Sequence, residues 1–142
     1  MKKRKTANRL TQTSRRGGAA IELALTAPFL LMLILGMVEL ARALMVQQVL
    51  TNASRVGARA AVLDTATVNS VELAVEDYLR DYAINSANIE VSPNPPTSAI
   101  PGDPVSVTIA VEYTDVAWLP LPEYMGDATQ TATAVMRRES TQ

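Results

Sequence analysis

One carboxylate stands at the edge of the most apolar part of this sequence. Glu22 directly precedes Leu23–Val38, a stretch of sixteen residues without a charged side chain. An ionisable group in such a setting is neutral unless a cation pairs with it, and inside a membrane helix it points to a function. Gly17 and Gly18 come shortly before it. Because glycine has no Cβ atom, the backbone there can adopt conformations that other residues resist.

The chain offers little for enzymatic chemistry. It contains no histidine and no cysteine, which excludes disulfides, thiolate sites and the catalytic triads that need either residue. Four acids lack the spacing of a calcium-binding loop and are typical of a solvated helix face: Glu72, Glu76, Asp77 and Asp81. We therefore expect no catalytic residue, no metal, no cofactor and no small-molecule substrate, and the protein is interpreted as not being an enzyme. Only one Phe, one Trp and four Tyr are present, so we also expect no nucleic acid as a partner.

The charges are divided unevenly along the chain. Residues 1–16 carry seven basic residues and no acid, which leaves six basic residues against fourteen acidic ones for the rest. A basic segment before a membrane helix stays in the cytoplasm, so the C-terminal domain is expected outside. The apolar stretch and its flanks reach the ~30 Å of a hydrocarbon core. We predict a single-pass protein of the bacterial inner (cytoplasmic) membrane, with a transmembrane helix over residues 18–46 and an extracytoplasmic domain over 47–142.

Other interpretations of these features stay open. A cleaved signal peptide would explain the basic start, and Ala41-Arg42-Ala43 loosely imitates its cleavage site. The apolar run is, however, longer than the usual ~7–15 residues. A buried core helix would need cover on every face, which a chain of 142 residues can hardly provide. Glu22 could also lie at the level of the lipid headgroups and be solvated there.

The elements that must position these residues begin with one long helix. Apolar residues recur at spacings of three and four after the membrane segment, so the helix should continue as an amphipathic extension over residues 47–63. Pro28 should bend it within the bilayer. Glu39 and Arg42 are three residues apart and should pair at the outer membrane boundary.

The remaining residues predict an α+β fold. A second, short helix is expected over residues 69–83, with Asn69 or Ser70 as its cap. Alternating and β-branched residues predict a small antiparallel three-stranded sheet, with strands over about 88–92, 105–113 and 129–137. The proline-braced apolar loop Trp118–Asp127 either packs on the sheet or contacts another subunit.

The segment around Gly17 resembles the leader of a type IV prepilin. It combines a basic start, small residues at the junction, and a glutamate five positions after Gly17. In that family a membrane-embedded peptidase cuts after the glycine, and the glutamate at the fifth mature position is thought to pair with the new amine of a neighbouring subunit. The resemblance implies a leader over residues 1–17, cleavage between Gly17 and Gly18, and an assembly role for Glu22.

Further along, the sequence is similar to the TadE-like pseudopilins of the tight-adherence (Flp-type, type IVb) pilus system. The residues that carry this similarity are Glu22, Pro28, the segment Gly36–Arg42, Asn52, Arg55, Gly57, Arg59 and the C-terminal Met136–Glu139. It implies a pilin-like fold and a minor pilin-like subunit that helps to assemble a pilus or related secretion filament for surface adherence. The implied partners are the inner membrane, a prepilin peptidase, other pilin-like subunits and pilus assembly proteins. The alternative is an uncleaved bitopic inner-membrane protein whose outer domain binds an envelope partner.

Overall fold

A computed structural model of the chain describes residues 11–117 and 128–138. These residues belong to two compact units, the first ending at Val38 and the second starting at Glu39. The whole of the predicted apolar loop Trp118–Asp127, together with the first ten residues of the basic leader, lies outside the described residues. Each unit is described by itself below.

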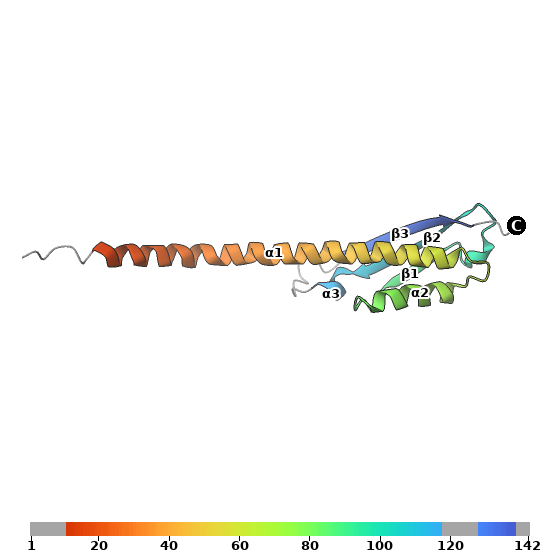
Figure 1. Cartoon of the computed structure of the whole chain (residues 1–142), viewed down its shortest axis with the longest axis horizontal. Helices are drawn as coiled ribbons and strands as arrows, with labels where there is room; N and C mark the ends of the chain where they lie inside the picture. Colours follow the sequence, from red (N-terminus) through yellow and green to blue (C-terminus); the bar gives the residue numbers. More distant parts are fainter. Residues whose placement is uncertain (1–10, 118–127, 139–142) are drawn as a thin grey trace, which may run out of the picture. The chain divides into compact units, whose positions relative to one another are not determined.

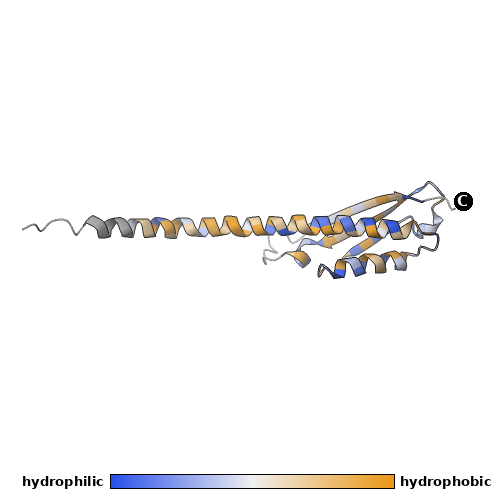
Figure 2. Cartoon of the chain, in the orientation of Figure 1, coloured by the Kyte–Doolittle hydropathy of each residue, from blue (hydrophilic) through white to orange (hydrophobic). Residues whose placement is uncertain are grey.

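Helix α1 (Thr11–Ala61) is the longest element, with 51 residues. It starts at Thr11, seven residues before the predicted start of the transmembrane helix at residue 18. It continues through Pro28 without a break in the ribbon (Figure 1), and the bend expected there stays a prediction. In the first unit its middle turns are strongly hydrophobic (Figure 2).

Helix α2 (Val68–Arg80) begins two residues after a buried alanine, Ala66, and has a different cap from the one expected. Thr67 is the N-cap: the Ser70 backbone N–H donates to its Oγ1 at 3.1 Å, and the Thr67 N–H donates to the Ser70 hydroxyl at 3.0 Å. This capping box satisfies two backbone donors, which neither Asn69 nor Ser70 alone would do. At the other end Ala83 has a left-handed φ of 57°, and the helix stops before it.

Three strands form an antiparallel sheet in the order β1-β2-β3. They are β1 (Asn88–Ser92), β2 (Pro104–Glu112) and β3 (Thr129–Arg137). The loop between β1 and β2 contains the short 3-10 helix η1 (Pro96–Ser98), and a single helical turn, α3 (Tyr113–Val116), follows β2. The predicted α+β class, with a long helix, a short helix and a three-stranded sheet, is confirmed.

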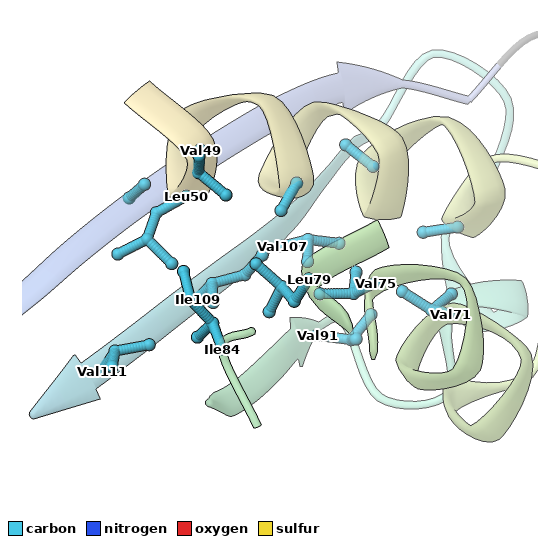
Figure 3. Close-up of a cluster of buried hydrophobic side chains, with 14 of the residues drawn as sticks. Val49, Leu50, Val71, Val75, Leu79, Ile84, Val91, Val107, Ile109 and Val111 are labelled. Carbon is cyan, nitrogen blue, oxygen red and sulfur yellow. The ribbon is translucent and has the colours of Figure 1, made fainter. Parts of the chain in front are cut away.

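The core of the second unit lies between the helices and one face of the sheet (Figure 3). Strand β2 alternates strictly, so that its buried residues point to the helices. The fully buried large side chains come from three elements: Leu50 from α1, Val71, Val75 and Leu79 from α2, and Val105, Val107, Ile109 and Val111 from β2. Since each element buries one face, the layers stabilise one another.

Candidate processing and assembly site

The two glycines of the predicted cleavage site lie on the open surface of α1. No atom of another element lies within 4 Å of where a Cβ would stand at Gly17 or Gly18. Both residues are helical, whereas a peptidase cleft needs an extended backbone. Each glycine weakens a helix by about 1 kcal/mol relative to alanine. Two in succession therefore make this a weak turn of α1, which can unwind at low cost.

Glu22 lies one turn after Gly18 and is exposed. Among the described residues its carboxylate has neither an ion pair nor a hydrogen bond; only its backbone carbonyl is engaged, accepting from the Thr26 hydroxyl at 2.9 Å. In a hydrocarbon environment such an acid needs a cationic partner from outside the chain or its neutral form.

The surroundings of Glu22 are apolar on every side of the helix. The large apolar side chains of the first unit are 39% to 75% exposed: Ile21, Leu23, Leu25, Phe29, Leu30, Leu31, Met32, Leu33, Ile34, Leu35, Met37 and Val38. Over Gly17–Ala61, α1 is long and apolar enough to cross a membrane, and none of its most apolar stretch is buried. This helix suggests membrane anchoring, since only hydrocarbon or other helices can cover such a surface.

Glu39 and Arg42 do not form an ion pair within residues 11–117 and 128–138. The Tyr113 hydroxyl instead donates to Glu39 Oε1 at 2.7 Å, and Arg42 Nε donates to the backbone carbonyl of Val116. Both partners belong to α3, which lies more than seventy residues later in the chain. Glu39 and Arg42 thus hold the turn after β2 against α1. Each side chain bonds to a residue of α3 instead of pairing with the other.

Glu39 is only 9% exposed, and its Oε2 atom has no hydrogen-bond partner among the described residues. Burial of the Tyr113 hydroxyl, and then its hydrogen bond to Glu39 and the charge of that group, raise the pKa of Tyr113 to about 12. The Arg42 charge acts in the opposite direction. Tyr113 is therefore a firmly protonated donor at neutral pH. Sequence reasoning placed it only in a strand, because nothing local marks it as a partner of Glu39.

Gly57 lies where α1 packs tightly against α2 and β2. A Cβ atom at this position would stand 2.7 Å from Val75 Cγ2 on α2 and 2.9 Å from Val107 Cγ1 on β2. Carbon atoms do not approach so closely, and valine side chains turn with difficulty. Only glycine lets these three elements meet here.

The other residues of the sequence resemblance lie on the outside of α1. Arg55 and Arg59 are exposed, and Asn52 is half-buried next to them on the helix surface. Ser54 is placed by the sequence on the polar outer face of the helix, but it is fully buried, and its hydroxyl donates to the Thr51 carbonyl at 2.9 Å. In the part of the chain that the structure describes, no cluster of three or more acids could hold a metal ion.

Comparison with known families identifies one segment. Residues 17–59 match the family model described as TadE-like protein. This segment is TadE-like. The match confirms the resemblance inferred from the sequence, and it indicates a pilin-like protein associated with the membrane and with the assembly machinery of the tight-adherence pilus. No curated protein and no solved structure matches the chain.

The TadE-like match starts at Gly17 and ends at Arg59. It therefore contains both glycines, Glu22 and Pro28, the Glu39–Arg42 region, and the motif residues up to Arg59. The C-terminal resemblance at Met136–Glu139 lies beyond it. The part of α1 that packs against α2 and the sheet is included, and the sheet itself is not.

Proposed function

We propose that this chain is a minor pilin-like subunit, a pseudopilin, that a prepilin peptidase cleaves between Gly17 and Gly18. After cleavage it contributes to a Flp-type pilus or related secretion filament for surface adherence. The observation that carries the proposal is the position of Glu22. It is the fifth residue of the cleaved chain, and it lies exposed at the start of an apolar helix within a TadE-like segment.

The electrostatics of the helix support an assembly role for Glu22. A carboxylate inside the bilayer is stabilised by a cation, and cleavage after Gly17 creates one, the α-amine of Gly18. Within one chain this amine and Glu22 are held one turn apart on the same helix. An amine from a neighbouring subunit can approach the exposed carboxylate directly. This pair between two subunits would form only in the assembled state.

The charge distribution supports a defined topology for the proposed subunit. The seven basic residues of the leader favour a cytoplasmic N-terminus in the inner membrane, and the second unit then lies outside. Cleavage at Gly17 removes all seven. After cleavage, the apolar surface of the helix would keep it in the membrane without the basic residues of the leader.

The intact mass of the protein purified from its native host tests this function. We expect a mature chain that begins at Gly18, and we expect Gly17→Leu to retain the 17-residue leader. Gly36→Leu serves as the control, because Gly36 has equally open surroundings but lies outside the leader. A full-length mass in the wild type would support the uncleaved bitopic protein instead. A mass starting at Leu44 would support signal-peptide cleavage after Ala43.

A further inference from the structure

A groove lies beside the end of α1, between the residues that follow this helix and the end of β3. It has a volume of about 630 Å³ and is lined by three apolar and three basic side chains: Val62, Leu63, Met136, Arg59, Arg137 and Arg138. Leu63 is 59% exposed. An apolar floor beside guanidinium groups fits an apolar side chain that carries carboxylates next to it.

The three arginines differ in how far the fold already uses them. Arg138 forms an ion pair with Asp64 at 3.5 Å and donates to the carbonyls of Thr97 and Ala99. Arg137 makes one long contact, 3.4 Å, to the Gly102 carbonyl. Arg59 is exposed and has no ion pair among the described residues. The groove therefore offers two arginines, Arg59 and Arg137, to an anionic partner.

The same chain carries the complement of this groove on α2. Leu73 is 57% exposed, on the face opposite the buried residues Val71, Val75 and Leu79. Glu76 lies one turn further along and is exposed. Asp77 lies beside it and forms an ion pair with Arg80 at 3.0 Å. This pair is exposed and therefore contributes little. An isolated large apolar side chain with an acid next to it is what the groove would accept.

We propose that α2 of a second copy docks in this groove, with Leu73 on Val62, Leu63 and Met136, and with Glu76 beside Arg59 and Arg137. The charges favour a second copy as the occupant, because the groove is basic and the exposed face of α2 is acidic. The chain after residue 16 carries six basic and fourteen acidic residues, so most other contacts between copies would bring like charges together. The two patches are different surfaces, so the contact is heterologous and each copy can both offer and accept a helix. The inference rests on the proposed function in one respect, that assembly brings copies together.

Cysteine crosslinking tests the contact directly, because the chain has no cysteine of its own. Full-length Leu63→Cys and Leu73→Cys chains are co-expressed in the native host, and the isolated membranes are treated with an oxidant. We expect a disulfide-linked dimer in the mixture and none from either variant alone. The double variant should give a ladder of linked chains. Val135→Cys with Leu73→Cys is the control, since Val135 is equally exposed on β3 but points to the other face of the sheet.

Charge reversal tests the electrostatic part. Arg59→Glu or Glu76→Arg should each lower the crosslinking yield by about tenfold or more, because like charges then face one another. Both changes in the same chain should restore most of the yield, since every contact again joins opposite charges. Arg55→Glu is the matched control: Arg55 is exposed one turn earlier on α1 and does not line the groove.

The outcomes separate this inference from the proposed function. Absence of the Leu63–Leu73 crosslink in membranes that contain the processed chain would overturn the docking and leave the function standing. Dimers from Leu63→Cys alone would also overturn it, because they indicate a symmetric contact. A crosslink between chains that keep their leader would support the docking and contradict the processing.

Discussion

Two glutamates of α1, Glu22 and Glu39, lie in opposite environments. Glu22 is exposed among apolar side chains and has no partner among the described residues. Glu39 is buried and accepts a hydrogen bond from Tyr113. A buried acid depends on donors within its own fold, whereas an exposed acid in an apolar setting has its interaction still to make. Glu39 therefore belongs to the fold, and Glu22 belongs to the proposed assembly.

The role of Glu22 predicts effects of opposite sign at two stages. Glu22→Gln should leave leader cleavage intact and make insertion slightly easier, since a carboxylate is removed from hydrocarbon. Assembly should be weakened by on the order of 3–5 kcal/mol, more than a hundredfold, because the amine of a neighbour loses its counter-charge. Membrane levels of the processed chain, measured beside crosslinking to pilus components, would show both effects.

Glu112→Gln provides the control for this experiment, because Glu112 is an exposed acid of the second unit. It should change neither quantity. Equal crosslinking in the wild type and in Glu22→Gln would make Glu22 a solvated residue at headgroup level. The physical support for subunit pairing would then be lost.

Replacement of Gly57 should destabilise the second unit. In Gly57→Ala the new methyl group overlaps Val75 and Val107, and overpacking of this kind costs about 1–3 kcal/mol. Thermal unfolding of the full chain in mild detergent, followed by near-ultraviolet circular dichroism, would show a lowered midpoint. Gly36→Ala is the control: its surroundings are open, so it should be neutral or slightly stabilising. An unchanged midpoint in Gly57→Ala would contradict the close approach of the three elements.

Tyr113 predicts a loss of stability at alkaline pH. Its pKa in the fold is raised to about 12, above the ordinary value of 10.0. The folded state therefore holds the proton more tightly, and the stability from this group is complete below about pH 10 and lost as the pH rises towards 12. Denaturation of Tyr113→Phe should depend less on pH in this window than that of the wild type.

A second variant identifies the cause of the raised Tyr113 pKa. Glu39→Gln removes the negative charge but keeps an acceptor, so Tyr113 should ionise at a lower pH than in the wild type. Absorbance of tyrosinate during an alkaline titration measures this directly. A titration unchanged by Glu39→Gln would show that Glu39 contributes nothing to the environment of Tyr113.

At the scale of elements, the two parts of α1 lie in different surroundings. Its first part exposes apolar side chains in all directions, and its later part buries one face against α2 and the sheet while Arg55 and Arg59 stay outside. Because the helix period is the same throughout, only the distribution of polar residues around it changes. Helix α2, by contrast, has only 13 residues, so its stability depends more on how its ends are capped.

The capping box of α2 should contribute measurably to stability. Thr67→Ala removes the acceptor of the Ser70 N–H and should cost about 1 kcal/mol. The midpoint of urea denaturation would fall accordingly. Thr65→Ala is the control, since Thr65 is exposed and its hydroxyl has no hydrogen bond among the described residues. Equal midpoints in both variants would show that α2 does not need this cap.

At the scale of the whole molecule, topology is the first property to establish. The basic leader resists translocation, so a reporter fused after Gln142 should be active only if it functions outside the cytoplasm. Reversing the leader charge, with Lys2, Lys3, Arg4 and Lys5 changed to Glu, should weaken this preference. Full activity of a cytoplasmic reporter at the same site would contradict the proposed orientation.

Local patterns in the sequence predict the anchor and the leader, and they were enough for most elements of the fold. The uncharged run before Glu39, the glycines at the junction and the spacing to Glu22 can all be read along the chain. The alternation in β2 also places its buried side correctly, since neighbouring strand residues point to opposite faces. Such signals depend on periods of two to four residues and need no knowledge of distant contacts.

Only the tertiary structure decided where distant residues meet. Tyr113 and Val116 replace the expected pairing of Glu39 with Arg42 because the end of β2 comes to rest on that turn of α1. Gly57 reads from the sequence as a motif residue, and its reason is the approach of Val75 and Val107. The groove beside Arg59 likewise forms only because the end of β3 lies next to the end of α1. These contacts join residues that are far apart in the chain, so packing and strand register, which no local period encodes, determine them.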